Sequence, residues 1–274
     1  MNALEVLKGS SQYRYGPHNT AGAVNFVTTP VILGEKYFGS VSYGSGHDII
    51  THDYINYGLT GNFGAVAILG ELYYRNGGGQ REFNIDPPSS SVHRKNYGSD
   101  ELGDMNMFAP MVKLLWQLPT ERNIILEVKY AYEDNNYNQS YAGQSTADFN
   151  ANPHHQYVAH QLGEYNTEHH TSYIKLRADL NSNISNTATA NYNYFTRDWF
   201  KLDSIIVTGT TTISEQVFNS RMATGDQLTA RNVAKGLTAG QLVYKGNDRQ
   251  SVSYTHLRAH ETVLDLVCRL LLEK

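Results

Sequence analysis

The segment Asn123–Asp134, "NIILEVKYAYED", carries the pattern that decides the fold. Its apolar and aromatic side chains recur at every second position, with charged side chains such as Glu127 and Lys129 between them. A period of two places alternate side chains on opposite faces of a β-strand, so the segment predicts a strand with one apolar and one charged face. The apolar face would hold Ile124, Leu126, Val128, Tyr130 and Tyr132, and the other face Ile125, Glu127, Lys129, Ala131 and Glu133.

The same alternation recurs along the chain from residue 35 onward. "GAVAILGELYYRN", "TSYIKLRADLN" and "TATANYNYFTRDW" all repeat it. Together these segments predict an all-β protein of about eight long antiparallel strands. The expected strands lie near 35–44, 51–61, 63–75, 105–118, 123–135, 170–181, 187–201 and 234–246.

The connections between these strands alternate in length. Asn62, the stretch 119–122 and the stretch 181–186 are short, whereas the connections between them are long and polar. Short turns at one end and long loops at the other are typical of outer-membrane β-barrels, and strands of this length can cross a bilayer at a tilt. A soluble β-sandwich also alternates, but its strands are usually shorter and loops of some thirty residues at one end are uncommon there.

Composition narrows the class of protein. The chain has 274 residues, 20 Tyr, 23 Gly and only 7 Pro, which favours strands and turns over helices. The formal net charge of −4 is too mild to indicate a nucleic-acid partner. No apolar run approaches the roughly 20 residues of a membrane helix, and no signal peptide opens the chain. The single cysteine, Cys268, permits no internal disulfide.

The first thirty residues add a specific motif. In "ALEVLKGSSQYRYGPHNTAGAVNFVTTP", a strand ending in Lys8–Gly9 is followed by Tyr15–Gly16, a turn of small residues and a second strand. The stretch resembles the end of the plug domain of TonB-dependent outer-membrane receptors. The residues that carry this resemblance are Glu5, Val6, Lys8, Gly9, Tyr15, Gly16, Gly22, Val24, Asn25 and Val27.

The resemblance narrows further along the chain. "YGPHNTAGAVNFVT", "GGGQREFN", "STADFNANPHHQYVAHQL" and "NYFTRDWFKL" are similar to the branch that includes the ferric dicitrate receptor. This resemblance implies the end of a plug over residues 1–33, followed over 34–251 by about the first eight of 22 strands of a plugged transmembrane β-barrel.

The resemblance implies import of a ferric chelate, of the ferric citrate type, across the outer membrane of a Gram-negative bacterium. The expected partners are TonB, acting through an N-terminal box that this sequence lacks, the ferric siderophore and outer-membrane lipid. No cofactor, nucleic acid or enzymatic activity is expected, since the ferric chelate is the transported ligand. The chain is interpreted as a fragment that begins within the true reading frame.

The closing stretch 252–274, "VSYTHLRAHETVLDLVCRLLLEK", is unlike the rest of the chain. It resembles the translation of an adapter used in transposase-based short-read sequencing, and we interpret it as an artefactual tail. The alternative is a genuine amphipathic helix, which the Leu, Ala, Glu and Arg content would favour.

An anionic ferric chelate requires cationic and amide side chains facing the barrel lumen, and the planar guanidinium of arginine pairs best with carboxylates. Arg197 is the first candidate, because it falls on the charged face of its strand, and the resemblance matches it to an arginine that contacts citrate. The weaker ligand-binding candidates are Arg221, Arg81 and Arg14. No catalytic motif and no metal site is predicted.

Other readings remain open. Five histidines crowd one region and could bind haem or a metal directly, although their spacing matches no compact zinc pattern. They are His154, His155, His160, His169 and His170. The receptor could also carry haem, cobalamin or another chelate, and a passive porin, a structural barrel or a soluble binding module would be functions of another class. The tyrosines at 130, 132, 192 and 194 are expected to form an aromatic girdle at the membrane interface.

Overall fold

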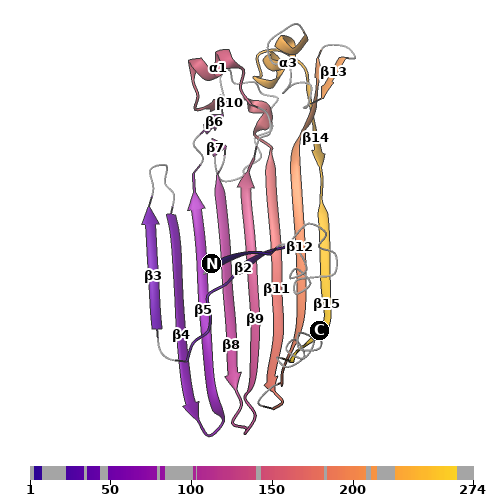
Figure 1. Cartoon of the computed structure of the whole chain (residues 1–274). Helices are drawn as coiled ribbons and strands as arrows, with labels where there is room; N and C mark the ends of the chain where they lie inside the picture. Colours follow the sequence, from indigo (N-terminus) through magenta and orange to yellow (C-terminus); the bar gives the residue numbers. More distant parts are fainter. Residues whose placement is uncertain are drawn as a thin grey trace, which may run out of the picture.

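A single open antiparallel sheet dominates the computed structural model (Figure 1). The structure describes residues 3–7, 23–33, 36–43, 49–78, 81–83, 101–102, 104–139, 143–181, 184–207, 211–214 and 226–263. The sheet has ten strands in the order β13-β12-β11-β9-β8-β5-β4-β3, with β14 and β15 also paired to β12. The strands are β3 (Lys36–Tyr43), β4 (Ile49–Gly61), β5 (Gly64–Gly77), β8 (Met105–Gln117), β9 (Ile124–Asn138), β11 (Glu164–Asp179), β12 (Ile184–Val207), β13 (Thr211–Ser214), β14 (Gln241–Gly246) and β15 (Arg249–Val263).

The long strands agree closely with the sequence pattern. Strand β9 contains the segment 124–134, and its neighbours β8 and β11 pair with it antiparallel along most of their length. The strand ends that the short connections join, after β4, β8 and β11, lie at one end of the sheet, and those that the long connections join, after β5, β9 and β12, lie at the other (Figure 1). The predicted all-β fold and the alternation of loop lengths are confirmed.

Strand pairing sorts the side chains onto two faces. Cross-strand partners share a face, so the register carries the alternation of β9 across the sheet. One partner row runs Asn56, Leu69, Lys113, Lys129, Tyr173 and Asn191. We call the face with this row the inner face and the opposite one the outer face. The charged side chains Glu71, Glu127, Lys175 and Arg177 also lie on the inner face.

The outer face is apolar and exposed. Ile174 is 55% exposed, and Val128 and Ala190 flank it on the neighbouring strands. Large exposed apolar surfaces of this kind are unusual in water, whereas a membrane barrel presents such a band, about 25 Å tall, to lipid. From Ile124 to Tyr132 the outer residues of β9 span about 27 Å at ~3.4 Å per residue. Other exposed side chains of the outer face are Ile55, Tyr57, Leu59, Ile68, Val112, Trp116, Leu176 and Tyr192.

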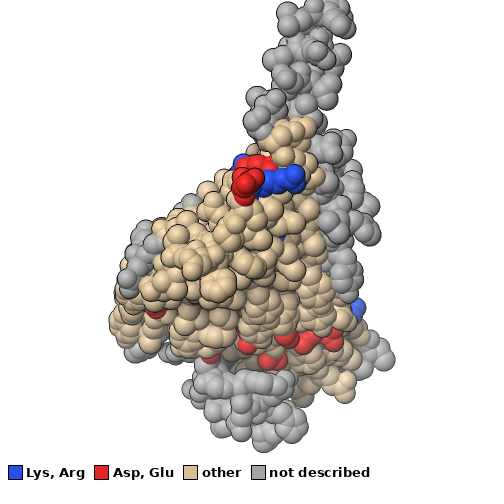
Figure 2. Space-filling view, turned by 90° about the horizontal axis from the view of Figure 1, so that it is seen from below, with Lys and Arg blue, Asp and Glu red and all other residues tan. Residues whose placement is uncertain are grey.

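The tyrosines expected to form a girdle lie together on the outer face. Tyr132 and Tyr194 flank His170 on adjacent strands, with ring centroids 4.9 Å and 5.7 Å from the imidazole. Tyr130 and Tyr192 form the next row toward the short turns. Such a cluster at the edge of an apolar band suits a membrane–water interface. Seen from the short-turn end, the described surface shows charged side chains only in a few small groups (Figure 2).

A two-stranded unit lies across the sheet (Figure 1). Its strands β1 (Ala3–Leu7) and β2 (Ala23–Val27) pair antiparallel in full register. The linker segment, residues 28–33, follows β2 and contacts the inner face through hydrogen bonds to Asn56 and Lys113. The β1–β2 pair therefore belongs to the same side of the sheet as the charged residues.

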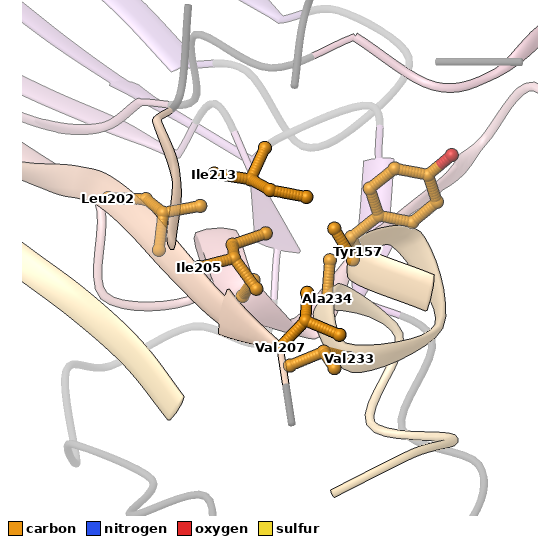
Figure 3. Packing of buried hydrophobic residues seen from close by; sticks show 9 residues of the cluster. Tyr157, Leu202, Ile205, Val207, Ile213, Val233 and Ala234 are labelled. Carbon is orange, nitrogen blue, oxygen red and sulfur yellow. The ribbon is translucent and has the colours of Figure 1, made fainter. Parts of the chain in front are cut away.

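A small apolar core lies at the long-loop end rather than along the sheet (Figure 3). It joins the tip of β12 to the helix α3 (Asp226–Ala234) and to the 3₁₀ turn η2 (Val158–His160). The other short elements are α1 (Thr146–Ala151), β6 (Arg81–Phe83), β7 (Glu101–Leu102) and β10 (His155–Gln156). The buried residues, which we call the cap cluster, are Tyr157, Ala159, Leu202, Ile205, Val207, Ile213, Ala230, Val233 and Ala234.

The last predicted strand, 234–246, differs from the structure in its bounds. Helix α3 ends at Ala234, and the strand begins only at Gln241 because Ala230, Val233 and Ala234 form one buried helical face. Beyond Asn247 the chain continues as β15, which pairs with β12 from Arg249 to Val263. The adapter-like residues 252–263 are thus in a strand and not in a helix, while residues 264–274, including Cys268, lie outside the described residues.

No helix in the described part of the chain is long and apolar enough to cross a membrane.

Candidate ligand-binding site

Arg197 lies on the inner face, toward the long-loop end of β12. Its partner on β11 is Thr167, and Thr167 pairs in turn with Asn135 on β9. The row continues through Met107 to Arg75 on β5. Two arginines therefore lie about 19 Å apart, at ~4.8 Å per strand, on one mostly polar row. Beyond them the row continues to Arg249 of β15, next to Arg197, and to Ile50 of β4, next to Arg75.

An aromatic row stands directly beside this polar row. Tyr137 and Tyr165 stack with ring centroids 4.9 Å apart, and Trp199 meets Tyr165 edge-on at 6.1 Å. The guanidinium carbon Cζ of Arg197 lies 5.3 Å from the Trp199 ring and 5.8 Å from the Tyr165 ring. Lys201 Nζ lies 4.6 Å from the Trp199 ring. Cation–π contacts of this kind hold both cations in place.

Some of the buried polar atoms of this row have no hydrogen-bond partner among the described residues. Arg197 Nη2 donates to Asn247 Oδ1 at 3.5 Å, but its buried Nε atom has no hydrogen-bond partner among the described residues. The buried Oδ1 atom of Asn135 likewise has none there. Buried polar atoms normally have partners, so a donor and an acceptor left open on one face, with one strand between them, suit a polar ligand. The fork of Arg197 would pair with carboxylate oxygens.

The four arginines predicted from the sequence do not form one site in the described structure. Arg81 begins β6 and pairs with Leu102 of β7, and nothing beyond this backbone pairing is described for it. Arg14 and Arg221 lie outside the described residues. Only Arg197 is placed on the inner face, and the structure adds Arg75, Asn135, Tyr165 and Trp199 to its surroundings. The alternation in "GAVAILGELYYRN" indicates which face of its strand Arg75 lies on. That Arg75 shares a cross-strand row with Arg197 depends on the register of four strand pairs.

The five clustered histidines are dispersed. His169 faces inward and bonds Asn193 Oδ1 at 2.9 Å, whereas His170 faces outward and bonds the Tyr130 hydroxyl at 2.8 Å. His160 is buried, His154 is exposed and His155 lies in β10. Across the described ranges, no three His, Cys, Asp or Glu side chains are grouped closely enough to hold a metal ion.

Asp148 joins two long connections above the sheet. Its Oδ2 accepts hydrogen bonds from the Tyr157 hydroxyl at 2.7 Å and from the Ser145 hydroxyl at 2.8 Å. Its Oδ1 accepts a hydrogen bond from Lys235, just after α3. Burial would raise the pKa of Asp148, but hydrogen bonds from Lys235, Tyr157 and Ser145 outweigh it and hold the pKa below its ordinary value. The carboxylate therefore ties the connection 139–163 to α3.

Replacing Asp148 with alanine is expected to loosen this tie. The variant leaves Tyr157 and Lys235 without their acceptor, at a cost of about 1–2 kcal/mol, because the carboxylate is partly solvated. Hydrogen exchange in residues 143–163 should accelerate while exchange in β8 and β9 stays slow. Asn150→Ala, an exposed change in the same helix, is the control, and equal protection in both variants would contradict the tie.

His160 predicts a pH dependence for the same region. Burial lowers the pKa of this imidazole to about 4. Below pH ~6.5 the His160 imidazole is protonated in the unfolded segment, whereas in the folded segment it stays neutral down to about pH 4. Stability of the packed loops should therefore fall as pH drops through this window, with a slope of up to ~1.4 kcal/mol per pH unit. His160→Gln should remove that slope in hydrogen exchange measured from pH 7 to 4.5, and an unchanged slope would contradict the assignment.

Comparisons with known proteins bear on the fold. No protein-family model and no curated protein sequence matches the chain. Among solved structures, the chain is similar to the crystal structure of the siderophore receptor PiuA from Acinetobacter baumannii, with a TM-score of 0.50 and 17% sequence identity. The match covers 77% of this chain and 29% of that receptor, so the chain spans less than a third of the receptor's length. At this identity the likeness shows the fold alone: an open sheet folded like part of a receptor barrel.

Proposed function

We propose that this chain is part of a TonB-dependent outer-membrane receptor that imports a ferric chelate, with ferric citrate as the ligand type. Residues 1–33 would be the end of the plug, residues 34–251 the first strands of the barrel, and residues 252–274 an artefactual tail. The receptor would lie in the outer membrane of a Gram-negative bacterium and would draw energy from TonB.

The observation that carries the proposal is the position of the Arg197 row. The row lies on the inner face, on the same side as the β1–β2 pair, and just beyond the aromatic edge of the apolar outer band. A ligand entering from the long-loop end would therefore meet Arg197 and Asn135 before it met the plug. One solved structure of similar fold is that of a siderophore receptor, which supports the same class of ligand.

Citrate is favoured within this class by chemistry. A ferric citrate complex is anionic and presents carboxylate oxygens, which guanidinium and amide groups recognise with charge-assisted hydrogen bonds. Arg197 offers such donors, and the Tyr165 and Trp199 rings hold its guanidinium in place.

Uptake by the full-length gene product tests the proposal. The gene would be expressed in iron-limited cells that lack their own ferric citrate receptor, and radioactive iron would be supplied as citrate, with haem and cobalamin as competitors. Iron uptake that requires TonB and is not displaced by haem or cobalamin would support the proposal. Displacement by either competitor would reassign the ligand, and solute entry that is independent of TonB would indicate a passive porin.

A further inference from the structure

Two buried polar side chains hold the linker segment against the inner face. Asn56 and Lys113 are only 1% and 4% exposed. Asn56 bonds one residue twice, because Ile32 N–H donates to Oδ1 at 3.1 Å and Nδ2 donates to Ile32 O at 2.7 Å. Lys113 Nζ donates to Thr29 O at 2.6 Å and also reaches Thr28 O at 3.4 Å. All four bonds join a barrel side chain to the linker backbone.

The Asn56 and Lys113 side chains lie on one cross-strand row of the inner face. Asn56 on β4 and Lys113 on β8 both have Leu69 of β5 as their cross-strand neighbour, so they lie on one row with a single strand between them. Leu69 itself is fully buried. The linker is therefore fixed at two points, which sets its direction across the strands as well as its position.

Moving the linker away from the wall would cost free energy, because the side chains of Asn56 and Lys113 would stay buried without these hydrogen bonds. An ammonium group and a carboxamide buried in the wall would lose their carbonyl and amide partners, and unsatisfied buried polar groups are strongly unfavourable. Lys129 provides the contrast. It lies on the same row, one strand beyond Lys113, and its ammonium lies 5.9 Å from the Tyr173 ring.

We propose that Asn56 and Lys113 are positioning residues that form a fixed pivot for the end of the plug. During transport the linker would stay attached to the barrel wall while the β1–β2 pair and the chain before it move. This inference rests on the proposed function, since it assumes that the β1–β2 pair belongs to a plug. The recognition is of backbone groups, so it does not depend on which chelate is carried.

A reversible cross-link tests whether the linker must leave the wall. In the full-length receptor, Ile32→Cys would be combined with Asn56→Cys and oxidised in intact cells. The pivot predicts that the oxidised receptor keeps the iron uptake of the reduced one. Loss of uptake on oxidation, regained on reduction, would overturn the pivot. Absence of uptake in the unmodified receptor would instead overturn the proposed function.

A second measurement needs no transport. Entry of a bulky glycopeptide antibiotic would be compared in cells that make the unmodified receptor, Asn56→Ala, Lys113→Met or Lys129→Met. Heat-shifted mobility in gels would first show that each of these barrels is folded. Entry should rise at least tenfold for Lys113→Met, since each lost charge-assisted hydrogen bond shifts an equilibrium by roughly tenfold or more. Asn56→Ala should raise it less, and Lys129→Met should not raise it. Equal entry through Lys113→Met and Lys129→Met would overturn the pivot.

Discussion

Ile174→Arg is expected to destabilise the barrel in a bilayer by about 2–4 kcal/mol, which is the cost of a cation on the lipid face near the bilayer midplane. Ile174 lies on the outer face between Val128 and Ala190, halfway along the apolar band. It is also among the most exposed apolar side chains of the sheet. In water an exposed isoleucine would tolerate arginine, so the size of the penalty reports on lipid.

A matched substitution on the inner face makes this result specific. Ala131→Arg places the same side chain on β9, where the neighbouring residues Met111 and Thr171 also lie on the inner face. The proposed barrel predicts only a small loss of stability for this variant, because the lumen of such a barrel is polar. Unfolding by denaturant in phospholipid vesicles, with both variants in the full-length protein, gives the comparison. Equal penalties, or a larger penalty at Ala131, would contradict the assignment of the faces.

Arg197→Ala is expected to weaken ferric citrate binding by roughly 10- to 100-fold, because a hydrogen bond to a charged group contributes about 1.5–3 kcal/mol. Arg197→Lys should recover only part of the affinity, since lysine keeps the charge but cannot form the paired bonds of a guanidinium. Equilibrium dialysis of iron-loaded citrate against the purified full-length receptor measures both effects.

Arg177 supplies the control for Arg197. It lies on the same inner face but near the short turns, where its Nη2 is 3.7 Å from Asp179 Oδ1. Arg177→Ala removes one positive charge from the inner face without changing the Arg197 row. We expect this variant to bind ferric citrate with unchanged affinity. Equal losses in the two variants would mean that lumen charge in general, and not the Arg197 site, attracts the ligand.

The parts of the fold that the sequence predicted are those where apolar and polar residues alternate strictly along a strand. Strands β9 and β12 show it clearly, and their short connections could be read from turn residues. Toward the long-loop end, beyond the apolar band, the strict alternation ends, and the predicted strand bounds are less accurate there. Strand β11 starts at Glu164, six residues before the expected 170, because the polar stretch "EYNTEH" continues the ladder without an apolar face.

The loop elements and the site depended on information that periodicity does not hold. Ser145 followed by Asp148 is a helix-start signal, and the Ser145 side chain does accept the bond from the Asp148 N–H. Helix α3 shows only the short apolar spacing of Ala230, Val233 and Ala234. The row that joins Arg75 to Arg197 is set by register, and a one-residue slip in any strand would break it.

The strand β15 illustrates how backbone pairing can be independent of sequence. Without β15, the edge of β12 opposite β11 would present unpaired N–H and C=O groups over this length, and an unpaired edge accepts an extended segment that follows it in register. Residues 252–263 occupy that edge from Ile184 to Tyr194. Their pairing is therefore compatible with our interpretation of 252–274 as translated adapter. Sequencing the locus with long reads across Gln250 would test that interpretation.

We propose that the outer face of the sheet contacts lipid and that the inner face lines a polar lumen. Spin labels placed singly at positions 173 to 178 of β11, in the full-length protein in bilayers, test it most directly. We expect high accessibility to oxygen at Ile174, Leu176 and Ala178, and high accessibility to a water-soluble nickel complex at Tyr173, Lys175 and Arg177. Uniform accessibility to the nickel complex at all six positions, or the reversed alternation, would contradict it.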